Sequence, residues 1–162
     1  PTLHFINPHQ AFSVGAQHIQ PYPVPHDATE PCQYIFSDGD KRIGVLTDAG
    51  HVTPYMQKLL SGCEALLIEC NHDRTMLRNG SYPPQLQKRV GGDRGHLSNC
   101  QTATFLKTAD TSKLQHCVIT HISEKNNTEQ LARLAVTEAL DCDEPWIVTA
   151  DQFIGLDWRE LT

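Results

Sequence analysis

The chain has 162 residues, of which 13 are Lys or Arg and 19 are Asp or Glu, so its formal net charge is −6 with histidine counted neutral. This length fits a single domain that can bury a sizeable core. A composition of 39% hydrophobic and 20% charged residues describes an ordinary soluble globular protein. No apolar run approaches the roughly 18 residues of a membrane-spanning helix, so we expect a cytoplasmic protein with no membrane partner. The negative charge argues against nucleic-acid binding by charge alone, although bound divalent cations would cancel several charges where a phosphate would lie.

The N-terminus and the cysteines exclude two further classes. Residues 1–5 lack the basic stretch followed by an apolar stretch that marks a signal peptide. The chain begins without Met, so we expect the numbering to start inside a longer protein. None of the six cysteines forms a Cys-x-x-Cys pair, which removes the commonest zinc-finger and redox patterns. Several lie in apolar segments, as Cys117 does, so we expect reduced, buried structural thiols.

The first third of the chain is predicted to be β structure. Short strands are expected at 12–14 and 18–24, with proline and glycine between them. The runs 33–36 and 42–47 flank Asp38-Gly39, and Asp-Gly between two β-prone runs is a strong hairpin signal.

After Asp48 the pattern changes to alternating helices and strands. Thr53 caps a helix that Gly62 ends. The apolar run 65–69 is typical of a strand covered on both faces. Segment 71–95 is polar, with one short helix expected at 85–90 and Asp73 as a possible cap of a turn.

The last third continues this alternation. A helix is expected at 99–107, a strand at 116–120, a helix at 128–140 and a final strand at 146–149. The apolar face of the long helix is predicted to contain Leu131, Leu134, Ala135 and Ala139. A β-rich front followed by alternating elements predicts a layered α/β domain.

Three residues of metal-binding type stand at the predicted ends of strands. His26 follows the strand 18–24, Asp48 ends the strand 42–47, and His121 ends the strand 116–120. A strand end fixes the backbone while the following loop stays open to solvent, which suits a ligand. Imidazole and carboxylate are first-choice ligands of zinc and also bind manganese. Taken singly, each histidine is more simply a surface residue and Asp48 a turn cap; the three matching placements together favour a metal site.

Five short segments also stand in a distinctive order along the chain: Val24-Pro25-His26-Asp27-Ala28, Gly44-Val45-Leu46-Thr47-Asp48, Leu66 to Asp73, Gly95-His96-Leu97-Ser98-Asn99, and Thr120-His121-Ile122-Ser123 with Asn126-Asn127. This ordered set resembles the metallo-β-lactamase-fold hydrolases. It is most similar to their bacterial nuclease-like branch, related to exonucleases and tRNA-processing endonucleases, over roughly residues 18–150. The resemblance implies an α/β fold of the layered αββα sandwich type.

The resemblance also implies a site with two divalent metal ions, zinc or manganese. In that family pattern His26 binds one ion, His121 the other, and Asp48 bridges both. Such a pair of ions activates a water and polarises a phosphoryl or carbonyl oxygen. Glu69 and His96 match the pair in which the histidine donates a proton to the leaving oxygen and the glutamate holds its imidazole. Left open are a loop cap for Glu69 and a surface position for His96. His72 is expected beside the site, behind the ligands.

Two further groups have two interpretations each. Ser123, Asn126 and Asn127 precede the helix 128–140, where backbone N–H groups and the helix dipole suit the phosphate of a substrate. Plain N-capping of that helix explains them equally well. The loop cations Lys88, Arg89 and Arg94 either contact a phosphate backbone or are solvated, and the solvated role is favoured.

The family's most diagnostic motif, His-x-His-x-Asp-His, is absent upstream of His26. We therefore expect residues 1–162 to form a single, incomplete domain, the C-terminal half of the fold, whose partner is the missing N-terminal half. One face of the sheet should then lack cover and expose apolar residues of 42–47, 65–69 and 116–120, which would favour a homo-oligomer.

The predicted function of the complete protein is that of a metal-dependent hydrolase, a phosphodiesterase acting on nucleic acid or on a small phosphodiester. One alternative is a thioester or lactone hydrolase on the same fold, and the other is a non-catalytic half-domain or fragment. The pair Glu69 and His96 favours the nuclease, because a poor alkoxide leaving group needs a proton donor and a thiolate hardly does. If the resemblance holds, His26, Asp48 and His121 should place their donor atoms within about 3–6 Å of one another.

Overall fold

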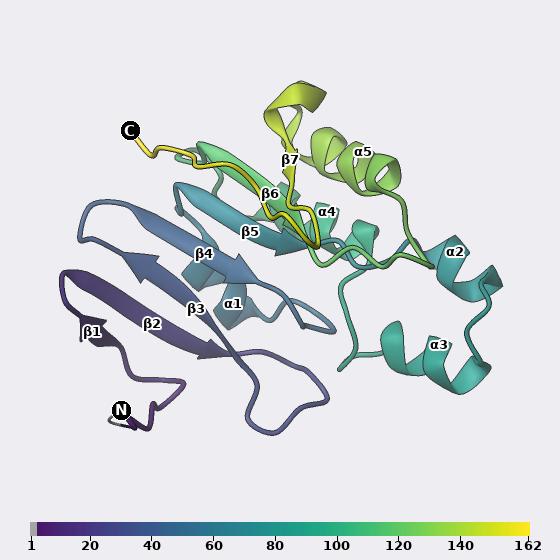
Figure 1. The fold of residues 1–162 in the computed structure, drawn as a ribbon, viewed down its shortest axis with the longest axis horizontal. Coiled ribbons are helices and arrows are strands. Elements are labelled where there is room, and N and C mark those ends of the chain that lie inside the picture. The colour runs from purple at the N-terminus through teal and green to yellow at the C-terminus, as the bar shows by residue number, and fades with distance from the viewer. Residues whose placement is uncertain (1–2) are drawn as a thin grey trace.

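A computed structural model describes residues 3–162, which form one seven-stranded sheet with helices (Figure 1). The strands lie side by side in chain order. The first four pair antiparallel, and the last four, from β4 onward, pair parallel. The strands are β1 Phe12–Val14, β2 Gln17–Pro23, β3 Cys32–Ser37, β4 Arg42–Leu46, β5 Ala65–Glu69, β6 His116–Thr120 and β7 Val148–Thr149.

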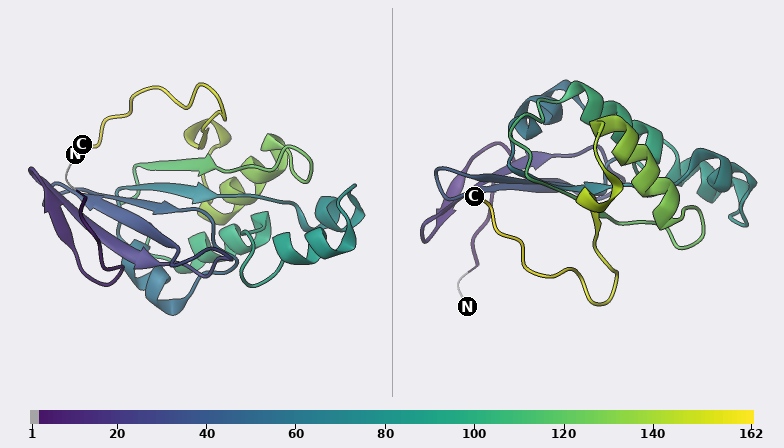
Figure 2. Two further views of the ribbon diagram at one scale, coloured as in Figure 1. Left: turned by 60° about the horizontal axis from the view of Figure 1, so that its bottom comes forward. Right: turned by 90° about the horizontal axis from the view of Figure 1, so that it is seen from above.

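The helices lie on one face of this sheet and beyond one of its edges (Figure 2). Three of them, α1, α4 and α5, cover one face, while α2 and α3 lie beyond the edge at which β4, β5 and β6 end. Their bounds are α1 Pro54–Leu60, α2 Arg74–Asn79, α3 Pro84–Val90, α4 Asn99–Thr108 and α5 Glu129–Leu140. In residues 3–162, no helix is both long enough and apolar enough to cross a bilayer.

Local sequence signals explain where most helices begin. The side chain of Thr53 accepts a hydrogen bond from the Met56 N–H, with proline at the first helical position of α1. Ser98 forms a reciprocal capping box with Gln101 at the start of α4. Thr128 caps α5. The expected helices at 99–107 and 128–140 are therefore confirmed to within one residue at each end.

Two expectations for the irregular segments are wrong. Segment 71–95 contains a second short helix, α2, which Asp73 caps by accepting hydrogen bonds from the Thr75 and Met76 N–H groups. The expected strand 146–149 is a 3-10 turn over Glu144–Trp146 followed by the two-residue β7. Both errors have one cause: the segments are too short for periodicity to distinguish a turn from a helix or a strand.

The predicted apolar face of α5 is correct for Ala139, which packs against the core, and wrong for its two leucines. Ala132 and Val136 are fully buried, whereas Leu131 is 37% and Leu134 is 54% exposed. The fully buried residues, Ala132 and Val136, are smaller than the two leucines and let α5 approach its neighbours closely.

The core lies between the sheet and the three helices that cover it. Leu46, Leu66, Ile68 and Ile119 point to this side and join one buried cluster with Leu60 and Leu106 from the helices. Of the cysteines, Cys63, Cys70 and Cys117 are buried free thiols as expected, and burial raises the pKa of Cys70 to about 12. Cys100 is exposed, so the expectation is wrong there.

The opposite face of the sheet has no helix on it (Figure 2). Ile43, Val45 and Leu67 alternate with the core residues and are half-buried rather than exposed. The segment after β7 crosses this face, where the Thr162 N–H donates to Gln115 Oε1 at 2.8 Å. The large exposed apolar residues lie outside the central strands, among them Phe153, Ile154 and Trp158 on that segment. The predicted lack of helical cover is present, but the expected exposure of strand side chains is not.

Candidate metal centre

The candidate site lies at one edge of the sheet because four strands end there. β2 and β4 run in the same direction, since each is antiparallel to β3, and β5 and β6 are parallel to β4. The residues after these strands therefore meet at a common edge. Two of them, Asp48 and His121, have a left-handed backbone with φ of +54° each. Few residues other than glycine adopt this conformation; Asp and His are among those that tolerate it, and it concentrates at functional sites.

Asp48 lies at the centre of three imidazoles. Its Oδ1 atom is 3.8 Å from His26 Nε2, 3.7 Å from His96 Nδ1 and 3.6 Å from His121 Nδ1. The ring of His96 is tilted by 61° to the ring of His26 and by 79° to that of His121, with centroids 5.1 and 5.0 Å away. His26 and His121 thus each approach Asp48 within the expected range, although the three residues come from separate parts of the chain.

Glu69 is a fully buried carboxylate that connects the parts of the site. Its Oε1 atom lies 2.7 Å from His96 Nδ1 and 2.8 Å from His121 Nδ1. Its Oε2 atom accepts hydrogen bonds from the N–H groups of Ala49 and Leu97, each at 3.3 Å. Burial would raise the pKa of Glu69, but the hydrogen bonds from His121 and His96 outweigh it and leave that pKa below its ordinary value. Glu69 is therefore an ionised acceptor with four partners.

The partners of the imidazoles determine which nitrogen carries the proton. His26 Nδ1 faces the Gly95 carbonyl oxygen at 3.0 Å, which can only accept, so Nδ1 donates and Nε2 keeps its lone pair. Nδ1 of His96 and of His121 donates to the Glu69 carboxylate in the same way. The hydrogen bond to Glu69 raises the pKa of His121. Among residues 3–162, Nε2 of these three rings makes no hydrogen bond, which is the arrangement found in metal-binding histidines whose other nitrogen is hydrogen-bonded.

The donor set fits a divalent metal ion. Asp48, Glu69, His96 and His121 each offer one ligand atom, and these atoms lie within 4.8 Å of one another. Ions bound at about 2.0–2.2 Å hold their ligand atoms roughly 3–4 Å apart, and nitrogen with carboxylate oxygen suits zinc or manganese. His26 lies beside this group of four, through its 3.8 Å approach to Asp48. No sequence pattern indicates that Glu69 contacts His121 as well as His96.

Asn126 and Asn127 lie inside the protein rather than at its surface. Asn127 exchanges hydrogen bonds of 2.9 and 2.8 Å with Asn99 and donates to the Cys70 carbonyl. Asn126 is fully buried, and its N–H donates to Ser123 Oγ at 3.2 Å. These contacts favour the structural interpretation of both asparagines over phosphate binding. Ser123 is half-buried, and its contact with a phosphate stays a prediction.

His72 is buried behind the site, with 2% of its surface exposed. The backbone of His72 joins the start of α4, since its carbonyl accepts from the Asn99 N–H at 2.9 Å. Its Nδ1 atom has no hydrogen-bond partner among residues 3–162. Burial lowers the pKa of His72 to about 4.

This buried histidine should make the fold sensitive to acid. The unfolded chain binds a proton at His72 below about pH 6.5, whereas the folded chain resists it until about pH 4. The free energy of unfolding should therefore fall by about 3 kcal/mol as the pH drops through this window. Chemical denaturation at several pH values should show a smaller fall for His72→Phe than for the parent, and an unchanged fall for the exposed-site control His18→Phe. Equal slopes for all three chains would contradict the expectation.

Comparison with known sequences agrees with this fold. A family model described as the beta-lactamase superfamily domain matches residues 1–122. Exodeoxyribonuclease YycJ of Bacillus anthracis is 34% identical over 127 residues, which are 78% of this chain and 48% of the relative. Exodeoxyribonuclease WalJ of Streptococcus pneumoniae serotype 2 is 33% identical over 141 residues, 87% of this chain and 50% of the relative. The chain thus spans about half the length of the curated relatives that it matches.

Solved structures share the fold at low sequence identity. The metallo-β-lactamase fold protein YhfI of Bacillus subtilis aligns with a TM-score of 0.67 and 14% identity over 94% of this chain and 54% of its own. Zinc-bound PqqB of Methylobacterium extorquens aligns with a TM-score of 0.66 and 19% identity over 94% of this chain and 55% of its own. Because the family model matches most of its length, the chain belongs to the β-lactamase superfamily, and its solved neighbours show that it has the metallo-β-lactamase fold.

Proposed function

We propose that the full-length protein, expressed from its complete reading frame, is a metal-dependent phosphodiesterase that acts on nucleic acid. The observation that carries this proposal is the hydrogen bond between the buried Glu69 carboxylate and His96. The Nδ1 atom of His96 also lies 3.7 Å from Asp48 Oδ1. The names of the curated relatives, exodeoxyribonucleases YycJ and WalJ, support a nucleic-acid substrate. The substrate class follows from the sequence likeness, and the chemistry follows from the side chains.

In this proposal His26, Asp48 and His121 would hold the divalent ions, zinc or manganese, with Asp48 between the two histidines. Bound ions supply Lewis acidity to a phosphoryl oxygen and make a water more acidic. Glu69 fixes the ring orientation of His96 and His121 through one oxygen atom, so it positions a proton donor and a ligand at once.

His96 is proposed as the proton donor. Its Nδ1–H group is directed at Glu69, which leaves Nε2 to carry the proton that is donated; the Glu69 carboxylate would stabilise the positive charge of the donating ring. This Nε2 proton passes to the leaving oxygen of the phosphodiester, and the ring returns to its neutral form. An alkoxide is a poor leaving group, so protonating it lowers the barrier, whereas a thiolate would gain little.

The test is an assay of the full-length protein on an oligodeoxynucleotide, on bis-p-nitrophenyl phosphate and on a thioester, with added Mn²⁺ or Zn²⁺. Hydrolysis of the phosphodiesters is expected. Turnover of the thioester alone would replace the proposal with a thioester hydrolase. No turnover and no bound metal would support the non-catalytic alternative.

Metal removal should abolish the phosphodiesterase activity. Dialysis against a chelator should take hydrolysis to background, and Mn²⁺ or Zn²⁺ should restore it, because the donor set holds no group that replaces a Lewis acid. The melting temperature should fall on removal, since a ligand at 100 times its Kd stabilises the folded state by about 2.7 kcal/mol. Full activity in the chelated protein would contradict the metal-site assignment.

A further inference from the structure

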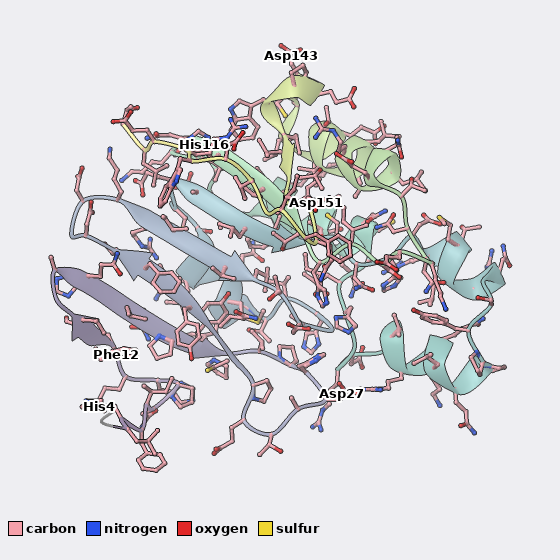
Figure 3. All side chains as sticks on the ribbon, in the orientation of Figure 1. His4, Phe12, Asp27, His116, Asp143 and Asp151 are labelled. Carbon is pink, nitrogen blue, oxygen red and sulfur yellow. The ribbon has the colours of Figure 1, made fainter. Side chains whose placement is uncertain are left out.

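A hollow of about 510 Å³ lies on the surface next to the candidate metal centre. Its walls are α3 and the loop that leads to His96, and they carry Lys88, Arg89 and Arg94. Asp27, the residue after His26, closes it on the side of the site. Figure 3 shows Asp27 in the loop after β2, beside α3.

The hollow is joined to the metal centre by direct contacts. Arg89 donates a hydrogen bond to Asp27, and the other oxygen of Asp27 lies 3.6 Å from His26 Nε2. His26 Nδ1 also contacts the carbonyl of Gly95, the residue after Arg94. A phosphate held in the hollow would therefore lie within a few side chains of the reacting groups.

The cations of the hollow differ in how they are used. Arg89 is paired with Asp27, and this hydrogen bond holds the pKa of Asp27 below its usual value. Lys88 and Arg94 make no ion pair with any carboxylate in the described part of the chain. With Asp93 also in its wall, the hollow has three cations against two carboxylates, although the chain as a whole carries −6. Lys88 and Arg94 are thus the charges left free for an anion.

The other side of the metal centre has the opposite charge. A smaller hollow of about 200 Å³ beside His121 contains Glu129 and Asp151 in its wall and no Lys or Arg. Figure 3 shows Asp151 beyond the end of β7, well separated from Asp27. A phosphate backbone would be repelled on this side and attracted on the other.

From this asymmetry we propose that the hollow at α3 holds the phosphate backbone of the nucleic-acid substrate, with Lys88 and Arg94 contacting phosphates on the His26 side of the scissile bond. The Arg89–Asp27 pair holds this surface against the loop that carries His26. The proposal rests on the proposed function and adds the path of the strand across the site. It replaces the solvated role that the sequence favoured for these cations.

The contacts of Lys88 and Arg94 with phosphates should be detectable in the affinity for an oligonucleotide as well as in the rate of its hydrolysis. In the full-length protein carrying His96→Ala to prevent cleavage, a fluorescein-labelled single-stranded oligodeoxynucleotide is titrated by anisotropy over a range of salt concentrations. The double variant Lys88→Ala with Arg94→Ala should bind at least about tenfold more weakly at low salt. The slope of log affinity against log salt should decrease by about 1.4, which is the loss of two single-strand phosphate contacts.

The matched control removes two cations from helix ends elsewhere, Lys58→Ala with Lys107→Ala, and should change the affinity by less than twofold. A second probe carries neutral methylphosphonate linkages on one side of the scissile position. This change should weaken binding to the parent and have little effect on the double variant, because both remove the same contacts. The metal content and the melting temperature of each variant should equal those of the parent, which shows that the site and the fold are intact.

If the full-length protein with His96 intact cleaves DNA, equal oligonucleotide affinity of the His96→Ala parent and the double variant would overturn the strand path. The proposed function would then still stand. An equal loss in the Lys58 and Lys107 control would also overturn it, since the effect would then be general charge. A gain in affinity from Glu129→Gln with Asp151→Asn, larger than any loss in the double variant, would place the strand on the other side, where these carboxylates repel phosphates. Failure of the parent to bind or cleave any oligonucleotide would overturn the proposed function itself.

Discussion

Replacing Asp48 with Asn in the full-length protein should abolish tight metal binding and reduce phosphodiester hydrolysis to background. Asp48 Oδ1 lies within 3.8 Å of His26, His96 and His121, so no other carboxylate takes its central place. Removing a residue that only hydrogen-bonds to a metal ligand lowers the metal affinity by roughly 10- to 100-fold. Removing the central carboxylate itself should lower the metal affinity by more than that. Titration with Zn²⁺ and Mn²⁺, read by metal analysis, measures the effect.

Asparagine is the informative replacement because it keeps the backbone. Asp48 has a φ of +54°, and Asn is among the few residues that tolerate this left-handed conformation. The metal-free Asp48→Asn chain should therefore melt within a few degrees of the metal-free parent, and only the stabilisation by added metal should disappear. Asp40→Asn, on the exposed hairpin, is the matched control and should retain both metal and activity. An Asp48→Asn protein with parental metal content would contradict the site.

Replacing His96 with Ala should lower kcat for an oligonucleotide by about 10²- to 10⁴-fold, the range that general acid–base catalysis contributes. The reason is the orientation of the ring, whose Nδ1 atom is bound to the buried Glu69 carboxylate at 2.7 Å and whose Nε2 atom is free. For bis-p-nitrophenyl phosphate, which releases a stable phenolate, the loss should be much smaller, because such a leaving group hardly needs a proton. Steady-state kinetics on both substrates measures the difference.

A structural role for His96 would have another signature. Loss of its contact with Glu69 would then affect both substrates equally and would change the metal content. His18→Ala removes an exposed histidine on β2 and should leave both rates unchanged. Equal losses on the two substrates would show that His96 positions the site and does not donate the proton.

The edge of the sheet where the candidate site forms could be predicted from the sequence, because it depends on chain order and strand direction. His26, Asp48 and His121 each follow a run of strand-forming residues, and the ends of parallel strands share an edge. Recognising this as a metal site required the family resemblance, since single histidines and aspartates at strand ends are common in loops.

The pairing of Glu69 with His96 was expected from the resemblance, but its contact with His121 could not be predicted, because that contact depends on the register of two strands. Glu69 pairs with Thr120 in the sheet, which places it next to His121, while His96 arrives from the loop before α4. Asn127 shows the same limit: its position before a helix is compatible with a phosphate site, and only its tertiary contacts with Asn99 and Cys70 show that it is occupied internally. The prediction of the buried face of α5 was wrong for its leucines because small buried residues such as Ala132 carry a weak apolar signal.

The left-handed backbone at Asp48 and His121 also affects how this family can lose activity during evolution. Asn and Asp tolerate that conformation better than most other residues. One nucleotide change converts an Asp codon to Asn, and one converts a His codon to Asn or Asp. Single mutations can thus remove a proposed metal ligand while the sheet edge keeps its shape. Inactive descendants that remain folded are therefore one mutational step away at both positions, and sequence surveys of the family should find them with Asn at one of these two sites.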